Sequence, residues 1–383
     1  MKNQIKILFF FPENPLLKNA GNKTRVLNLL YYFKSRNIQV DFVSIEHYNF
    51  RTNKEITEFM DSGLVNDVSI LKRKPDRKYK WKYLVEYKLP KIFLEKKSSF
   101  SNMSLYTHKQ FNNLIKNKQY DYIVISYISA INLINRKYTN GAKIILDTHD
   151  FLTANYQYLK GFSLGSYFEE EIKLANQADE VWAISHDEYF IFNQFCKNNV
   201  KLISSWEKDN TQTTLTKKKY DLIYIASDNP HNIKSCNWFF SKVYPSLPTT
   251  ISICVIGKIS NYVEAYNNVT KIEFVENLEE YYQNSKISIC PMLTGTGIKI
   301  KVIEALSYGL PIVCTLRGID GLSNKTNNGC WVAENEKEFS EHIIQLLNDP
   351  KLYEKYRKQS VDFFTENYSI EIGYKKLDQT FII

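Results

Sequence analysis

Short apolar runs separated by longer stretches with helical periodicity recur along the sequence, and this alternation constrains the fold most strongly. The runs are rich in β-branched and aromatic residues and lie at 5–11, 40–45, 120–126, 142–148, 180–185, 200–204, 221–227, 251–257, 271–275, 286–293 and 311–316. Fully apolar strands that alternate with helices are typical of parallel sheets covered on both faces. The sequence therefore predicts an α/β fold with two doubly wound units in series.

The length and one polar stretch predict the domain boundaries. A chain of 383 residues is longer than a single core usually supports. The polar segment 207–219 has no apolar periodicity and is predicted to be a linker. After the last strand, we expect two helices near 350–366 and 369–380. The predicted parts are an N-terminal Rossmann-like domain at 1–207, a C-terminal one at 220–365, and a C-terminal helix at 366–383 that packs back on the N-terminal domain.

The stretch GTGIKIKVIEALSYGLPIV, at 295–313, places two glycines between a predicted strand and a predicted helix. Glycines let the backbone approach a ligand closely, and the free N–H groups of a first helical turn attract anions. A helical wheel gathers the polar residues of the mostly apolar helix on one stripe, consisting of Lys301, Glu304 and Tyr308, while Lys299 lies in the first turn. This pattern favours a phosphate site with Glu304 on the ribose hydroxyls. The alternative is a Lys–Glu pair on a solvated edge.

The same stretch resembles the donor-binding segment of the GT4 family of retaining GT-B glycosyltransferases. EALSYGLPIV (304–313) resembles the family's E-A-hydrophobic-small-x-G-x-P-V-V pattern. PHNIKSCNWFFSKVYPSL (230–247) resembles the Pro-Asn…Trp-Phe helix of one branch, and LRGIDGL (316–322) resembles a Gly-x-x-Gly-Leu turn. The resemblance is strong over 220–365 and weaker over 1–205.

This resemblance implies two Rossmann-like domains that face each other across a cleft, a UDP- or GDP-sugar donor, and a ribose contact from Glu304. It implies no bound metal and no cofactor besides the donor substrate. The chain departs from the family at Thr296, where many members carry a second glutamate that helps to hold the donor sugar. The family's usual Arg and Lys after the first strand of the C-terminal domain are also missing. Lys299 and Lys301 are therefore the best local charges for the diphosphate, next to Thr296 and Gly297 of the glycine loop.

Two further candidate elements lie in the first half of the chain. Gly21 and Arg25 follow the first predicted strand in a loop that resembles the family's N-terminal glycine loop, which implies contact with the donor phosphate or the acceptor. The alternative is an ordinary helix start with Asn22 as its N-cap. IILDTHDF ends a later strand and resembles the family's D-x-H-D, whose histidine lies near the donor sugar. His149 is thus the candidate catalytic residue, and no residue stands out as a nucleophile.

Positive charge is concentrated in one segment. Residues 72–97 hold eleven Lys/Arg and three Asp/Glu, so their net charge is +8 out of +9 for the chain. Aromatic and aliphatic residues alternate with these charges, which is typical of a segment attracted to anionic lipid. We predict a membrane or acceptor patch formed by Lys78, Lys80, Trp81 and Lys82. The alternative is an exposed lysine-rich loop.

The cysteines and the hydropathy indicate the compartment. The six cysteines include no CxxC pair, and three lie within apolar runs, which favours buried thiols over disulfides or a zinc site. No apolar run approaches the roughly 18 residues that a membrane span needs. The sequence predicts a cytoplasmic protein with peripheral attachment to the inner face of the membrane.

The prediction that unites these patterns is a metal-independent, retaining hexosyltransferase. It would move a sugar from a nucleoside-diphosphate sugar to a glycan or lipid-linked acceptor, in the synthesis of bacterial surface polysaccharide. The alternatives are a GT-B epimerase or phosphorylase, a non-catalytic sugar-nucleotide-binding protein, and a nucleic-acid-binding protein that uses residues 72–97. We expect no nucleic-acid partner.

Overall fold

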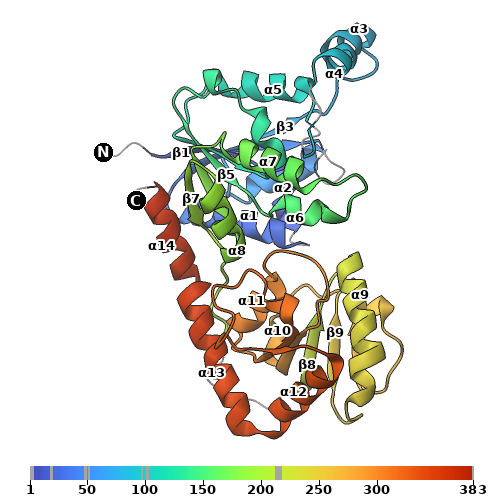
Figure 1. The fold of residues 1–383 in the computed structure, drawn as a ribbon. Coiled ribbons are helices and arrows are strands. Elements are labelled where there is room, and N and C mark those ends of the chain that lie inside the picture. The colour runs from blue at the N-terminus through green and yellow to red at the C-terminus, as the bar shows by residue number, and fades with distance from the viewer. Residues whose placement is uncertain are drawn as a thin grey trace. The chain divides into compact units, whose positions relative to one another are not determined.

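The structure is a computed structural model that describes residues 4–17, 20–46, 50, 52–95, 98–100, 103–211 and 218–381. Its contacts divide the chain into unit 1, Met1–Ile184 with Glu188–Leu202, and unit 2, Ser185–Asp187 with Ile203–Ile383. Each unit is a parallel sheet with helices on both faces (Figure 1). This confirms the predicted fold class of two doubly wound units. Half of the predicted linker, at 212–217, and two lysines of the basic segment, at 96–97, lie outside the described residues.

Unit 1 contains a seven-stranded sheet with the order β3-β2-β1-β4-β5-β6-β7. Its strands are β1 (Lys6–Phe10), β2 (Gln39–Ile45), β3 (Asp67–Leu71), β4 (Tyr122–Ser126), β5 (Lys143–Asp147), β6 (Glu180–Ala183) and β7 (Asn199–Leu202). Its helices include α1 (Gly21–Ser35), α2 (Asn53–Asp61), α3 (Lys80–Tyr83), α4 (Leu89–Phe93), α5 (Leu105–Ile115), α6 (Leu152–Asn155), α7 (Leu164–Ala175) and α8 (His186–Phe195). Phe9 of β1 packs on Phe33 of α1, whereas Phe10 packs on Phe111 of α5. Successive residues of one strand therefore contact helices on opposite faces, as period-two alternation requires.

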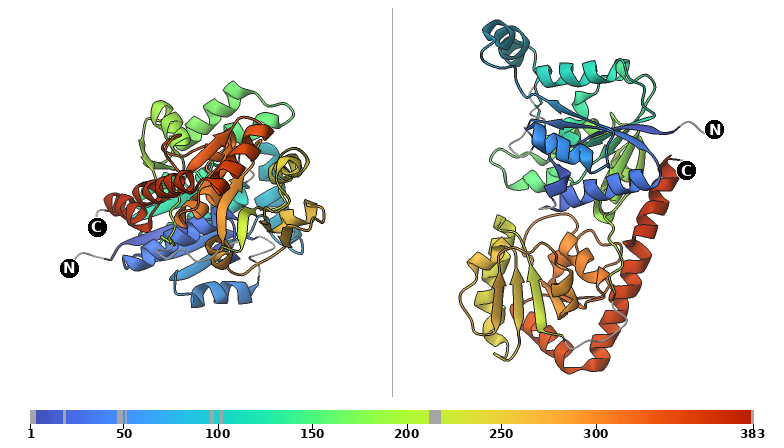
Figure 2. Two further views of the ribbon diagram at one scale, coloured as in Figure 1. Left: turned by 90° about the horizontal axis from the view of Figure 1, so that it is seen from below. Right: turned by 180° about the vertical axis from the view of Figure 1, so that it is seen from behind.

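Unit 2 contains a six-stranded sheet with the order β10-β9-β8-β11-β12-β13. Its strands are β8 (Tyr220–Ile225), β9 (Ile253–Ile256), β10 (Val269–Ile272), β11 (Ser285–Cys290), β12 (Ile312–Thr315) and β13 (Cys330–Ala333). Its helices include α9 (Pro230–Trp238), α10 (Glu279–Gln283), α11 (Ile300–Ser307), α12 (Glu336–Asn348), α13 (Pro350–Asn367) and α14 (Ile370–Phe381). Two hydrophobic cores result: α11 and α13 cover one face, and α9 and α12 cover the other (Figure 2).

The structure confirms most of the predicted elements and corrects a few. The two helices expected after the last strand are α13 and α14, within one residue of the predicted bounds. By its contacts α14 belongs to unit 2, and its packing on the N-terminal domain stays a prediction. Strands β3 and β13 were not predicted. Helix α11 begins at Ile300, so Lys299 lies just before the helix and not in its first turn.

Both sheets have a topological switch point, where the order of the strands along the sheet reverses. It lies between β1 and β4 in unit 1 and between β8 and β11 in unit 2. Ligands of doubly wound sheets bind at the carboxyl ends of the strands at such points. The loops after these four strands are therefore the first places to look for a site.

Candidate functional site

The glycine loop of unit 2 follows β11 and adjoins the loop after β8. Gly295 and Gly297 have φ values of +100° and +71°, which other residues adopt only with strain. The ring nitrogen Nδ1 of His231 lies 2.9 Å from the hydroxyl of Thr294, and the backbone N–H of Leu293 donates to Ser235 at 3.1 Å. The loop thus lies at the switch point of this sheet, as its sequence predicts.

Glu304 lies on α11, the helix that directly follows this loop in the chain. It is half-buried, as are Lys301 and Tyr308, so the polar stripe predicted from the helical wheel is present. The Tyr282 hydroxyl donates to Oε2 of Glu304 at 3.2 Å, and its ring stacks on Tyr308 at 4.8 Å. Burial raises the pKa of Glu304, while the Tyr282 hydrogen bond and the Lys301 charge oppose this rise. A carboxylate in such a position has acceptor capacity left for two adjacent hydroxyl groups.

Glu207 is a second carboxyl group near Glu304, and sequence reasoning missed it because it lies at the start of the predicted linker. The segment that carries it is fixed to unit 2: the N–H of Glu207 donates to Tyr368 O and the N–H of Asn210 donates to Ser307 O, both at 2.9 Å. Burial raises the pKa of Glu207 to about 8, and the charge of Glu304 adds to the effect. No periodic pattern in the sequence signals this pairing.

The position of Glu207 gives a pH-dependent prediction for stability. Because its pKa in the fold exceeds the ordinary value of 4.5, the unfolded chain loses this proton first, and the folded state loses stability as pH rises from about 4.5 to 8. Glu207→Gln removes this loss. We expect its thermal midpoint to exceed that of the wild type at pH 9 by about 3 °C or more, with a much smaller gain at pH 5. Glu341→Gln, an exposed acid on α12, is the control, and an equal gain at both pH values for Glu207→Gln would contradict the prediction.

The two lysines predicted to meet the diphosphate are both engaged within unit 2. Lys299 is buried, and its Nζ donates to the carbonyl oxygens of Gly297 at 2.7 Å and Thr296 at 3.1 Å. Lys301 donates to Oδ1 of Asn232 at 3.0 Å, and burial lowers its pKa. Lys299 therefore stabilises the glycine loop through hydrogen bonds to its backbone. Contact of either lysine with a diphosphate stays a prediction.

Alanine variants of these lysines test that prediction. Lys299→Ala and Lys301→Ala should weaken binding of a nucleoside diphosphate by about tenfold or more, and binding of the nucleoside much less, because a charged hydrogen bond contributes about 1.5–3 kcal/mol. Calorimetry with UDP and uridine, or GDP and guanosine, measures both losses. Lys299→Ala should have the larger effect, since it also releases the loop carbonyls. Lys337→Ala on α12 is the control, and equal losses for nucleoside and diphosphate would assign the lysines to the fold alone.

The site residues of unit 1 gather at the carboxyl ends of β4 and β5. Arg25 is buried and forms a salt bridge with Asp147, with Nη2–Oδ1 at 2.6 Å and Nε–Oδ2 at 3.1 Å. Although burial alone would raise it, the charges of Arg25 and His149 hold the pKa of Asp147 well below its ordinary value. Arg25 thus binds the carboxylate that also contacts His149. Its contact with the donor phosphate or the acceptor stays a prediction.

His149 combines three unusual features. Its φ is +61°, in the left-handed region, and its side chain is only 2% exposed. Nε2 lies 3.1 Å from Oδ2 of Asp147 without the alignment of a hydrogen bond, and Nδ1 has no hydrogen-bond partner among the described residues. A strained backbone and an unsatisfied buried polar atom are both typical of sites completed by a ligand.

Tyr127, which sequence reasoning did not single out, stacks on His149 with ring centroids 4.4 Å apart. It follows β4 and has a φ of +69°. Its hydroxyl accepts a 2.7 Å hydrogen bond from Nδ2 of Asn22, at the start of α1 next to Gly21. The N-cap of α1 is Ala20, so the alternative interpretation of Asn22 as an N-cap is wrong. The position of Tyr127 directly after a central strand was the signal that could have found it.

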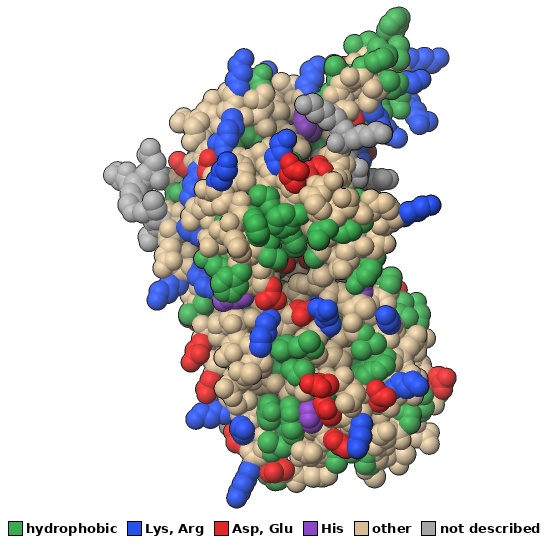
Figure 3. Space-filling model, viewed as in Figure 1, with side chains coloured by type: hydrophobic (Ala, Val, Ile, Leu, Met, Phe, Trp, Pro, Cys, Tyr) green, Lys and Arg blue, Asp and Glu red, His purple; other side chains and the backbone are tan. Residues whose placement is uncertain are grey.

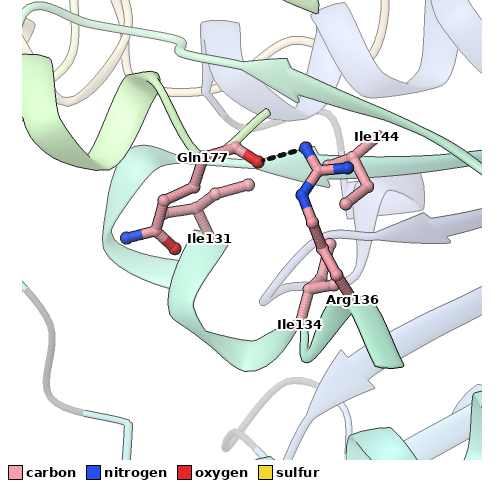
Figure 4. Close-up of a pocket in the computed structure, with 5 residues that line it drawn as sticks. All are labelled: Ile131, Ile134, Arg136, Ile144 and Gln177. Atoms are coloured by element: carbon pink, nitrogen blue, oxygen red, sulfur yellow. Dashed lines mark hydrogen bonds between the residues drawn. The ribbon is translucent and has the colours of Figure 1, made fainter. Parts of the chain in front are cut away.

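A small pocket elsewhere in unit 1 does not belong to this cluster. It encloses about 150 Å³ and is lined by Ile131, Ile134, Arg136, Ile144 and Gln177 (Figure 4). Ile144 lies near the amino end of β5, opposite the end that leads to His149, and Arg136 donates to Gln177 O at 2.7 Å. Across the residues that the structure describes, no cluster of three or more His, Cys, Asp or Glu has the arrangement of a metal site.

Comparison with known proteins shows which family and which solved structures this chain resembles. Residues 219–349 match the family model described as glycosyl transferases group 1. A 44.6 kDa protein in the cps region of Klebsiella pneumoniae is 21% identical over 299 residues, which cover 70% of this chain and 76% of that protein. A glycosyltransferase from Haemophilus influenzae is 25% identical over 293 residues, which cover 69% and 76% of the two chains.

The fold also matches solved structures over its full length. The crystal structure of Anabaena Alr3699/HepE in complex with UDP and glucose superimposes with a TM-score of 0.69 at 13% sequence identity, covering 99% of both chains. An identity this low establishes the fold only. The two doubly wound units therefore have the GT-B fold, and residues 219–349 match the model of the family glycosyl transferases group 1.

Proposed function

We propose that this protein is a retaining glycosyltransferase that moves a hexose from a UDP- or GDP-sugar to a glycan or lipid-linked acceptor, in the synthesis of bacterial surface polysaccharide. The observation that carries the proposal is Glu304, a half-buried carboxylate behind a glycine loop at a topological switch point. The family match covers this element, a relative lies in a cps region, and a protein of the same fold binds UDP and glucose. The proposal includes no resident metal or cofactor.

A panel of nucleotide sugars tests the donor class. A ligand at about 100 times its dissociation constant stabilises the fold by roughly 2.7 kcal/mol, which a thermal shift detects easily. We expect a UDP- or GDP-sugar to stabilise the protein and the free nucleoside to do so much less. Transfer to an acceptor should continue in the presence of a metal chelator. Turnover of the donor without any acceptor would favour the epimerase, and no shift with any nucleotide sugar would refute the proposal.

We further propose that the basic segment of unit 1 docks on anionic membrane. Residues 80–93 form one continuous helical stretch, made of α3, the π-helical turn η2 (Leu84–Lys88) and α4. Several of its large apolar side chains are exposed, with Trp81 at 79%, Ile92 at 62% and Phe93 at 76%. Lysines surround them, and both kinds of side chain gather where α3 and α4 lie (Figure 3). Exposed apolar groups on a basic helix suit the interface of an anionic bilayer. Among the described residues, no helix is long and apolar enough to cross a bilayer.

Replacing Lys78, Lys80, Trp81 and Lys82 together by alanine should weaken binding to anionic vesicles on the order of 100-fold, because each lysine contributes at most about 1 kcal/mol and the indole adds to this. Flotation with anionic and neutral vesicles at low and high salt measures the effect. We expect wild-type binding to be selective for anionic vesicles and to fall steeply with salt.

A matched control removes the same charge elsewhere. Alanine at Lys54, Lys137, Lys160 and Phe190 also deletes three exposed lysines and one exposed aromatic ring, and should leave vesicle binding unchanged. Equal weakening by both variants would mean that net charge alone drives binding. Wild-type protein without preference for anionic vesicles would favour a soluble acceptor.

A further inference from the structure

One hydrogen bond of unit 1 spans the switch point between β1 and β4. The side chain of Asn22, in the first turn of α1, is used at both ends: Nδ2 donates to the Tyr127 hydroxyl at 2.7 Å, and Oδ1 accepts from the N–H of Lys23 at 2.9 Å. The amide is therefore fixed in orientation. It ties the helix that follows β1 to the residue that follows β4.

Tyr127 is fixed from the other side as well. Its N–H donates to Asp147 O at 2.9 Å, although its own φ is +69°. Its ring stacks on the imidazole of His149, and the ring of Phe11 lies nearly parallel to both, 6.1 Å from Tyr127 and 5.8 Å from His149. Two left-handed non-glycine residues in contact store strain, which persists only where surrounding contacts hold them.

The imidazole held by this stack is short of hydrogen bonds. Its Nδ1 has no hydrogen-bond partner among the described residues, and its Nε2 lies 3.1 Å from Oδ2 of Asp147, a carboxylate that Arg25 also binds. Among the described residues, the ring's orientation therefore depends on this contact with Asp147 and on the stacking of Tyr127 and Phe11.

We propose that Tyr127 and Asn22 are positioning residues, whose mutual hydrogen bond holds the His149 imidazole ready for a hydroxyl group of the transferred sugar. This inference rests on the proposed function, in which His149 serves the transfer step. The same bond joins the start of α1, where Gly21 is predicted to contact donor or acceptor, to His149. A ligand that displaces the start of α1 should therefore change the orientation of the His149 ring.

The test isolates the hydroxyl of Tyr127. Tyr127→Phe keeps the ring stack and deletes the hydrogen bond, and Asn22→Ala deletes the same bond from its other end. NMR of protein with isotope-labelled histidine, with the His149 signals assigned through His149→Asn, reports the ring directly. We expect both single variants to move the His149 signals to the same position, and the double variant to move them no further. Tyr156→Phe is the control, because this half-buried tyrosine also stacks, on Phe100 at 5.6 Å, and its hydroxyl has no hydrogen bond within the described chain.

Kinetics provide the second readout. Each single variant should lower kcat about fivefold, the double variant should equal the singles, and the Kd for nucleoside diphosphate should stay unchanged. Unmoved His149 signals in Tyr127→Phe, or losses of kcat that add in the double variant, would overturn the inference. A wild-type protein without turnover on any nucleotide sugar would refute the proposed function instead, while the NMR comparison would still decide whether Tyr127 and Asn22 position the histidine.

Discussion

Glu304→Ala is expected to weaken binding of the nucleoside diphosphate by about 100-fold or more. In the proposed complex the carboxylate accepts two hydrogen bonds from the ribose, and a hydrogen bond to a charged group contributes about 1.5–3 kcal/mol. The fold should survive the change, because burial raises the pKa of Glu304 and so disfavours its charged form in the fold. Calorimetry with UDP and GDP measures the affinity, and the thermal midpoint of the free protein measures the fold.

Two further variants sharpen this test. Glu304→Gln keeps the volume and can still accept from Tyr282, so it should lose less affinity than alanine. Glu341→Ala removes an exposed acid from α12 and should bind like the wild type. Unchanged affinity in Glu304→Ala would remove Glu304 from the nucleotide site and with it the main support for the proposed donor.

His149→Asn is expected to lower turnover by about 100-fold and to leave the affinity for nucleoside diphosphate within about twofold. The magnitude is that of deleting one preorganised polar group beside a reaction centre. The affinity should persist because His149 belongs to unit 1, whereas the ribose and diphosphate contacts proposed for Glu304, Lys299 and Lys301 belong to unit 2. Asparagine is the informative replacement, since it tolerates the positive φ at this position better than alanine does.

Steady-state kinetics with the donor identified by the panel, together with calorimetry, separate the two quantities. His108→Ala changes a different histidine of unit 1, which is half-buried on α5, and should keep wild-type turnover. Wild-type turnover in His149→Asn would make His149 a structural residue. A parallel loss of affinity would place it at the nucleotide.

The sequence predicted the central strands well and three of the four edge strands poorly, and burial explains most of the difference. Strands such as β1 and β11 are covered on both faces, so they are continuous apolar runs. The unpredicted strands β3 and β13 lie at sheet edges and are only partly buried. Edge strand β10 was predicted two residues too late for the same reason. A strand with one face in water leaves a weaker pattern, and here it is only four or five residues long.

In the candidate site, the sequence revealed features within one short segment but not contacts between residues far apart in the chain. The glycine loop, Glu304 and the polar stripe are local features of one strand–turn–helix unit, and they could be found from the sequence. The salt bridge between Arg25 and Asp147 joins residues 122 positions apart, and Tyr127 meets His149 only because β4 and β5 are neighbours. Helical periodicity does not encode such partners. The sequence therefore did not reveal Asp147 as the partner of Arg25, and contact of Arg25 with a ligand stays a prediction.

The segment that leads into unit 2 has a consequence for the order in which the protein is made. Trp206 packs against α14 so closely that a Cβ atom on Gly373 would lie 2.6 Å from the indole, and Glu207 pairs with Ser369. These partners are translated long after the segment itself, whereas the sheet of unit 1 is complete once residue 202 has emerged from the ribosome. Domains generally fold in the order of their synthesis. Unit 1 is therefore expected to fold on the ribosome. Residues 203–207 can take their final positions only after α14 has been synthesised and unit 2 folds.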